Sequence, residues 1–151
     1  MWVIPASPSD SVSIDSRLDD MGSGVRLRLM NTPRRLEGLV AIVTGGASGF
    51  GECISKQYAD LGAKLVVADL NPEKAEEVAA AIVAAGHEAI SCQVDVADSA
   101  AMGALVAAAL ERFGRIDVMV NNAGMSHDNR PMLEVDEAFF DRLYAVNVKS
   151  I

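Results

Sequence analysis

A glycine-rich loop between a strand-like and a helix-like segment is the feature that most restricts how this chain can fold. Residues 44–51, TGGASGFG, follow the apolar run 39–43 and lead into the helix-compatible segment 52–61. Glycine N–H groups can approach a pyrophosphate closely, and the positive end of the next helix dipole favours its negative charge. The spacing Gly-x-x-x-Gly-x-Gly differs from the usual dinucleotide fingerprint, so the loop alone does not identify a nucleotide site.

An acidic residue lies where a dinucleotide site needs one. Asp69 ends the strand-like run 64–68, eighteen positions after Gly51. A carboxylate there can accept hydrogen bonds from both hydroxyls of an adenosine ribose. It would repel a 2′-phosphate, and neither Ser48 nor Leu70 supplies a cation to bind one, so the sequence favours NAD over NADP. Asp69 alone would also fit an ordinary strand end, but its spacing from the loop favours the cofactor interpretation.

From residue 39 onward the chain alternates between short apolar runs and longer segments with helical periodicity. Glycines stand where helices should end, and Asn71-Pro72 and Asp98-Ser99 are residue types that begin helices. This alternation is typical of an α/β fold in which helices cover both faces of a parallel sheet. We therefore predict a doubly wound parallel sheet of about four strands. The expected strands are 39–44, 64–69, 88–94 and 116–120, and the expected helices are about 50–61, 72–85, 99–113 and 136–150.

Composition restricts the size and the partners of the protein. The 151 residues, half of them hydrophobic, fit a single domain. The formal net charge of −8 lies after residue 38, where eight basic side chains face sixteen acidic ones. This excess argues against nucleic acid or an anionic membrane as a partner. The sequence shows neither an apolar run of ~18 residues nor a signal peptide, so we expect a soluble, cytoplasmic protein.

The two cysteines give no sign of a metal site. Cys53 and Cys92 lack metal-ligand spacing and an accompanying histidine cluster. We therefore predict no metal, and we expect both thiols to be small buried side chains in a reducing cytoplasm.

The first residues differ in character from the rest. Residues 1–34 are rich in Ser, Asp, Arg and Pro and lack a helical apolar stripe. We expect a flexible leader, and a biological start at Met21 or Met30 would remove most of it from the native protein. Residues 35–151 then form the folded domain.

Two further polar motifs follow expected strands. Asp95-Val96 comes after the third strand, and Asn121-Asn122-Ala123-Gly124 comes after the fourth. Ligands of doubly wound sheets bind just beyond the carboxyl ends of the strands. A carboxylate at the first motif can accept a hydrogen bond from an adenine amino group. At the second, small residues let the loop lie against the nicotinamide ribose, and asparagine amides can tie neighbouring strands. Such a run is also ordinary turn chemistry, but its register with the other motifs favours the cofactor.

Together these motifs resemble the short-chain dehydrogenase/reductase family. Residues 44–51 match its Thr-Gly-x-x-x-Gly-x-Gly loop, Asp69, Asp95-Val96 and 121–124 match its later motifs, and Asn147 matches its helix asparagine. The resemblance covers residues 36–151 with the family's spacing throughout. It implies a Rossmann fold and an NAD-dependent oxidoreductase that moves a hydride between nicotinamide and an alcohol or carbonyl carbon. It also implies a small alcohol or ketone substrate and a homo-oligomer for the full-length form.

The resemblance assigns roles to individual residues. Asn147 would position the water that links a catalytic lysine to a proton relay, and Thr44 would tie the loop to the strand. His87 and His127 match no role in the family. The cofactor-binding residues would be Gly45, Ser48, Gly49, Phe50 and Gly51 at the pyrophosphate and nearby riboses, Asp69 with Leu70 at the adenosine ribose, Asp95 and Val96 at the adenine, and Asn122, Ala123 and Gly124 at the nicotinamide side.

One part of the family pattern is missing. In the family, a serine and a Tyr-x-x-x-Lys motif follow the helix asparagine; the tyrosine is the general acid/base, and the lysine lowers its pKa. Neither Tyr58 nor Tyr144 has a lysine four residues later. We therefore expect a truncated cofactor-binding domain with the strand 116–120 at its edge. Such a chain should be marginally stable, prone to aggregation and inactive by itself.

Two other functional classes stay open. A non-catalytic module that uses NAD as a structural ligand would fold and bind NAD without turnover, whereas a truncated enzyme would fold poorly and bind weakly. A methyltransferase shares the glycine loop and the acidic residue after the second strand. It does not explain residues 121–124 or Asn147.

Overall fold

The computed structural model describes residues 35–126 and 131–151. Strands and helices alternate along them, as the sequence predicts. The expected leader, 1–34, lies outside the described residues, and so does His127. The elements are β1 (Val40–Thr44), α1 (Gly49–Asp60), β2 (Lys64–Asp69), α2 (Pro72–Ala84), β3 (Ala89–Gln93), α3 (Ser99–Phe113), β4 (Val118–Val120), the 3-10 helix η1 (Met132–Glu134), α4 (Glu137–Tyr144) and the π-helical segment η2 (Ala145–Lys149).

The strands form one parallel sheet in the order β3-β2-β1-β4. Val43 of β1 pairs with Val67 of β2 on one side and with Val120 of β4 on the other. All residues of β1 are buried, as are the middle residues of β2. Both strands are continuous apolar runs because they are covered from both faces of the sheet.

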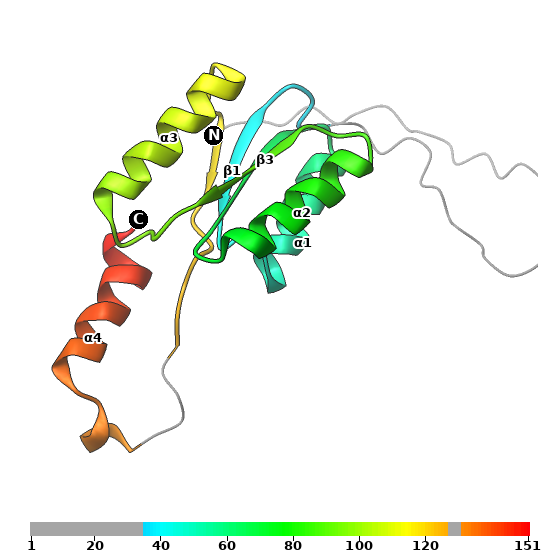
Figure 1. The fold of residues 1–151 in the computed structure, drawn as a ribbon. Helices are drawn as coiled ribbons and strands as arrows, with labels where there is room; N and C mark the ends of the chain where they lie inside the picture. Colours follow the sequence, from blue (N-terminus) through cyan, green and yellow to red (C-terminus); the bar gives the residue numbers. More distant parts are fainter. Residues whose placement is uncertain (1–34, 127–130) are drawn as a thin grey trace, which may run out of the picture. The chain divides into compact units, whose positions relative to one another are not determined.

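Helices cover both faces of this sheet, with α1 and α2 on one face and α3 on the other (Figure 1). Alternate strand residues point to opposite faces, so two buried clusters form. Val43 and Leu65 pack on the first face with residues of α1 and α2 that include Ile82. Ile42 packs on the second face with Leu105 of α3. This arrangement confirms the doubly wound α/β fold.

Polar side chains begin the helices at the predicted positions. The side-chain oxygen of Asn71 accepts a hydrogen bond from the Lys74 N–H at 2.9 Å, and Asp98 Oδ1 accepts one from the Ala100 N–H at 2.8 Å. Each bond satisfies a donor that a first helical turn leaves without a partner. Gly114 ends α3 with φ 78°, a left-handed conformation that glycine adopts without strain.

The strand β4 is shorter than the expected 116–120. The Asp117 N–H donates to the Val40 carbonyl at 2.9 Å, but the Val40 N–H donates to Asp117 Oδ2, also at 2.9 Å. A side-chain oxygen thus replaces a backbone carbonyl in the ladder, and regular pairing begins only at Val118. The position of β4 at the edge of the described sheet agrees with the prediction.

The expectation of two buried cysteines is wrong for Cys53, which is exposed. The buried residues of α1 include Ser55 and Ala59, and residues two apart on a helix point in different directions. Cys92 is half-buried, and this burial raises the pKa of its thiol.

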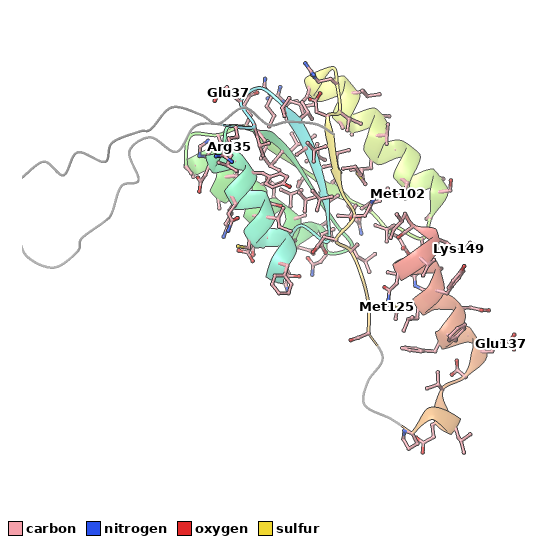
Figure 2. All side chains as sticks on the ribbon, turned by 180° about the vertical axis from the view of Figure 1, so that it is seen from behind. Arg35, Glu37, Met102, Met125, Glu137 and Lys149 are labelled. Atoms are coloured by element: carbon pink, nitrogen blue, oxygen red, sulfur yellow. The ribbon has the colours of Figure 1, made fainter. Side chains whose placement is uncertain are left out.

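The expected helix 136–150 is present, but its end is not a regular α-helix. Asp136 begins it, because its Oδ1 accepts a hydrogen bond from the Phe139 N–H at 2.7 Å. Near its end the Ser150 N–H donates to the Ala145 carbonyl at 3.1 Å, across five residues, so the turn is wider than in an α-helix. Figure 2 labels Glu137 and Lys149 near the two ends of this helix.

Candidate functional site

A cavity of about 500 Å³ opens at the carboxyl ends of the strands. Its walls come from the β1–α1 loop, from the segments at the ends of β2, β3 and β4, and from α4 and η2. The strand order reverses here between β1 and β4, which is where doubly wound sheets bind ligands. The cavity is lined by Gly45, Ser48, Asp69, Leu70, Val94, Asp95, Val96, Asn122, Ala123, Gly124, Met125, Arg142 and Val146.

The cavity brings together residues from every motif that the sequence singled out between residues 44 and 124. Of the predicted binding residues, Gly49, Phe50 and Gly51 do not line it and instead form the first turn of α1. Phe50 is 86% exposed there, whereas Gly51 is buried. Asn147 lies next to the lining residue Val146 but does not itself line the cavity.

Two glycines of the loop allow the chain to pass close to its neighbours. A Cβ on Gly45, which has φ 61°, would lie 3.0 Å from Ala123 Cα and 3.0 Å from Asn122 Nδ2. A Cβ on Gly51 would overlap the carbonyl oxygen of Gly45. The glycines therefore let the loop, the start of α1 and the segment after β4 meet at one place. Gly49 has φ 53° and open space around it.

The Asp69 carboxylate is held by backbone donors from two sides. Its Oδ2 accepts a hydrogen bond from the Ala47 N–H at 3.1 Å, and its Oδ1 accepts one from the Asn71 N–H at 3.0 Å. An ionised carboxylate has about four acceptor sites, so each oxygen keeps a lone pair for a ligand. The loop and the start of α2 thus fix this side chain at the cavity wall, and both of its oxygens can still accept a hydrogen bond from a ligand.

The segment after β4 is tied to the end of β1 by Thr44 and Asn122. The Thr44 hydroxyl donates to the Val120 carbonyl at 3.2 Å and accepts from the N–H groups of Asn122 and Ala123 at 3.2 and 3.1 Å. The Asn122 amide donates to the carbonyls of Thr44 and Gly45 at 2.9 and 3.2 Å. These bonds confirm the expected structural role of Thr44 and the expected tie between neighbouring strands.

Asp95 faces the same cavity and carries an ion pair that crosses to α4. Arg142 Nη2 donates to Asp95 Oδ2 at 2.8 Å, and the Ala97 N–H donates to Asp95 Oδ1 at 3.0 Å. The bond from Arg142, followed by the bond from Ala97, holds the pKa of Asp95 below its ordinary value. The carboxylate is therefore ionised and oriented at neutral pH.

Asn147 binds the backbone directly after the segment 122–124 and does not line the cavity. Its Oδ1 accepts a hydrogen bond from the Met125 N–H, and its Nδ2 donates to the Met125 carbonyl, both at 2.8 Å. Met125 is the residue that follows Gly124, so this pair fixes the segment after β4 against η2. Figure 2 labels Met125 on the segment that leads out of the sheet.

Sequence reasoning missed three residues of the cavity wall, Val94, Arg142 and Val146. Val94 directly precedes the Asp95-Val96 motif, so the motif itself marks its position. Arg142 of α4 and Val146 of η2 belong to the terminal helix, which comprises residues 137–149. Nothing in their spacing shows which face of that helix meets the strand ends. Met125 also lines the cavity, directly after the predicted Gly124; residues 127–130 lie outside the described part of the chain.

The wall of the cavity combines hydrogen-bonding groups with small and apolar residues. It offers two carboxylates, from Asp69 and Asp95, together with small residues at positions 45, 123 and 124. In the part of the chain that the structure describes, no three His, Cys, Asp or Glu side chains gather as metal ligands would. The two carboxylates are hydrogen-bond acceptors, as hydroxyl or amino groups of a ligand would require.

A model of the short chain dehydrogenase family matches residues 39–151. The chain belongs to this family. The match spans the glycine loop, Asp69, Asp95 and the segment after β4, and it confirms the resemblance inferred from these motifs.

Two proteins named as dehydrogenases are similar to this chain over about three quarters of its length. It is 48% identical over 112 residues to the 4-formylbenzenesulfonate dehydrogenase of Comamonas testosteroni, covering 74% of this chain and 44% of that protein. It is 40% identical over 114 residues to the sorbitol dehydrogenase of Cereibacter sphaeroides, covering 76% of this chain and 43% of that protein. The chain thus spans less than half the length of these relatives.

Solved structures agree with the fold. The 3-ketoacyl-(acyl-carrier-protein) reductase of Brucella melitensis complexed with NADH has a TM-score of 0.71 at 43% identity, over 76% of this chain and 46% of that one. A metagenomic short-chain oxidoreductase in complex with NADP has a TM-score of 0.71 at 40% identity, over 76% of this chain and 52% of that one.

No helix within residues 35–126 and 131–151 combines the length and the apolar character needed to cross a bilayer. The cytoplasmic location, the leader and the domain boundary at residue 35 stay predictions.

Proposed function

We propose that residues 35–151 form the nicotinamide-dinucleotide-binding part of an oxidoreductase that transfers a hydride between the cofactor and a small alcohol or ketone. The observation that carries this proposal is the meeting of Asp69, the glycine loop and the segment 122–124 around one cavity. When bound, the nicotinamide supplies the hydride chemistry, and the chain supplies binding and orientation.

The residues fit such a cofactor, because Gly49 at the exposed start of α1 leaves open space where a side chain would stand. Gly45 in turn lets the loop lie closely against the segment after β4. Helix starts of this kind favour phosphate groups. Gly45, Ser48, Gly49, Phe50 and Gly51 would hold the pyrophosphate and nearby riboses. Asp69 and Leu70 would lie at the adenosine ribose, Asp95 and Val96 at the adenine, and Asn122, Ala123 and Gly124 at the nicotinamide side.

We propose NAD rather than NADP as the cofactor. The similar solved structures include one complex with NADH and one with NADP, so the choice rests on this chain's own residues. The Asp69 carboxylate has free acceptor sites for ribose hydroxyls and would repel a phosphate in their place. Ser48 and Leu70, which share the cavity wall with it, carry no positive charge.

We propose that residues 1–151 by themselves show no turnover. The two tyrosines of this sequence, Tyr58 and Tyr144, are followed four positions later by Gly62 and Val148 instead of lysine. The tyrosine and lysine that transfer the proton in this family have no counterparts here. Asn147 is the member of that relay that the chain contains, and its side chain is bound to Met125. Assembly into a homo-oligomer is part of the same proposal for the longer form.

Calorimetric titration of the purified 151-residue chain with NAD tests the proposal. We expect saturable binding that is weakened about tenfold or more by Asp69→Asn, because hydrogen bonds to a charged group contribute about 1.5–3 kcal/mol. We also expect the preference for NAD over NADP to shrink in this variant, since the repulsion is removed. Asp60→Asn is the matched control, because Asp60 is an exposed aspartate that pairs with His87 away from the cavity.

Several outcomes of this titration would contradict the proposal. Equal NAD affinity in Asp69→Asn and in the unmodified chain would exclude the assigned ribose contact. Binding of S-adenosylmethionine in place of NAD would support the methyltransferase alternative. Dehydrogenase turnover by the purified chain would show that the tyrosine argument is wrong.

A further inference from the structure

Two side chains of the terminal helix contact the segments that follow β3 and β4. Arg142 binds Asp95 after β3, and Asn147 binds Met125 after β4. In a regular α-helix with 3.6 residues per turn, positions five apart differ by about 140° around the axis. The wider π turn of η2 reduces this angle, and Arg142 and Asn147 both reach the strand ends.

The pair between Arg142 and Asp95 is partly exposed, but it lies at the cavity wall. Both residues line the cavity, and Asp95 is the carboxylate assigned to the adenine. The Ala97 N–H occupies Oδ1 at 3.0 Å and Arg142 occupies one side of Oδ2 at 2.8 Å. With one bond on each oxygen, the plane of the carboxylate is fixed and a lone pair on each oxygen stays available.

We propose that Arg142 is a positioning residue for the adenine end of the cofactor, which it orients by holding the Asp95 carboxylate. This inference rests on the proposed function and adds to it a residue on the terminal helix. Arg142 acts through Asp95, which accepts the hydrogen bond from the adenine amino group. Because Arg142 belongs to the same helix as Asn147, occupation of the adenine end and docking of this helix stabilise each other.

The test compares NAD with its hypoxanthine analogue, in which a carbonyl replaces the adenine amino group. The unmodified chain should prefer NAD by about tenfold, the effect of one hydrogen bond to a charged group. In Arg142→Gln this ratio should fall to about two- or threefold, because Asp95 is no longer held in place. Arg142→Lys keeps the charge on a more flexible stem and should retain part of the preference.

A double-mutant cycle separates positioning through Asp95 from direct contact with the ligand. In an Asp95→Asn background the Arg142→Gln change should leave the NAD affinity unaltered. If it still weakens NAD there, Arg142 touches the ligand itself and the proposal is overturned. Arg112→Gln is the matched control, since Arg112 is an exposed arginine of α3 that pairs with Glu88 and does not line the cavity.

A purely structural role for Arg142 has a different signature. It would weaken NAD and the hypoxanthine analogue equally and leave their ratio unchanged, which would overturn the inference. Failure of the proposed function is recognised separately, as an absence of Asp69-dependent NAD binding in the unmodified chain. Should Arg142→Gln fail to fold, the preference for NAD over the hypoxanthine analogue is measured in Arg142→Lys and in Asp95→Asn instead. The proposal requires that both variants show a smaller preference than the unmodified chain.

Discussion

The two walls of the cavity are held in place by different forces. On one side, β1 and β2 are buried from both faces and packed by α1, α2 and α3. On the other side, β4 is half-exposed along its length and no residue of α4 is buried. Besides the packing of Val118 and Val120 against the core, this second side is positioned by hydrogen bonds and one ion pair, from Thr44, Asn122, Asn147 and Arg142.

The comparison shows how one site can combine a half dominated by apolar packing with a half that depends more on polar contacts. Apolar burial is not directional, so the β1 and β2 side depends on a whole core rather than on any one contact. Hydrogen bonds are directional, and each one on the β4 side fixes a particular backbone group. Loss of a single partner there changes the local geometry more than the global stability.

The largest expected effect is a loss of stability when a buried side chain of the β1 and β2 side is shortened. Leu65→Ala, at a fully buried position of β2, should lower the free energy of unfolding by about 2–5 kcal/mol, because it leaves a cavity between the sheet and its helices. Met119→Ala on β4, where the side chain is 37% exposed, should cost under about 1 kcal/mol. Urea denaturation followed by circular dichroism measures both, and equal losses would remove the distinction between the two sides.

A smaller effect is expected from removing one hydroxyl on the polar side. Thr44→Val keeps the shape of the side chain but leaves the N–H groups of Asn122 and Ala123 without their acceptor. We expect a loss of roughly 1–3 kcal/mol in stability, with faster amide exchange concentrated at residues 122–125. Thr44→Ser retains the hydroxyl and is the control. Uniformly faster exchange across β1 and β2 would mean that the hydrogen bonds of the Thr44 hydroxyl stabilise the core rather than the β4 side.

The smallest expected effect is on how the stability of the fold depends on pH. Arg142 and Ala97 lower the pKa of Asp95 in the folded chain, so this ionised carboxylate stabilises the fold above its ordinary pKa. The contribution is lost as the pH falls through the lowered value, below about pH 4. In thermal melts between pH 2 and pH 5, the Asp95→Asn variant should show a flatter decline than the unmodified chain. Parallel declines would show that this ion pair adds nothing to stability, as is common for exposed pairs.

Much of the fold follows from local patterns in the sequence. The caps at Asn71 and Asp98 and the glycine at position 114 lie where their residue types predict them, because a cap satisfies backbone groups within one helical turn. The structure differs from these predictions where the deciding contact is made by a residue outside the local pattern. The Asp117 side chain displaces the start of β4 because it binds Val40, which is 77 residues away. Cys53 is exposed because the face that α1 turns to the sheet is set by Ser55 and Ala59.

The residues of the candidate site likewise divide into those that the sequence predicts and those that it does not. Gly45, Asp69 and Asp95 were found from the sequence because they follow apolar runs, and parallel strands bring their carboxyl ends to one edge. Arg142 was not found, because its partner Asp95 is 47 residues away and the contact depends on how the terminal helix docks.

By itself, the sequence determined the order of strands and helices, the glycine loop and the carboxylates at the strand ends, because periodicity and capping act between residues that are close in the chain. Only the tertiary structure decided which face of the terminal helix meets the cavity, which pairs Arg142 with Asp95 and Asn147 with Met125. Such contacts depend on the packing of whole elements, and no short stretch of sequence contains that information.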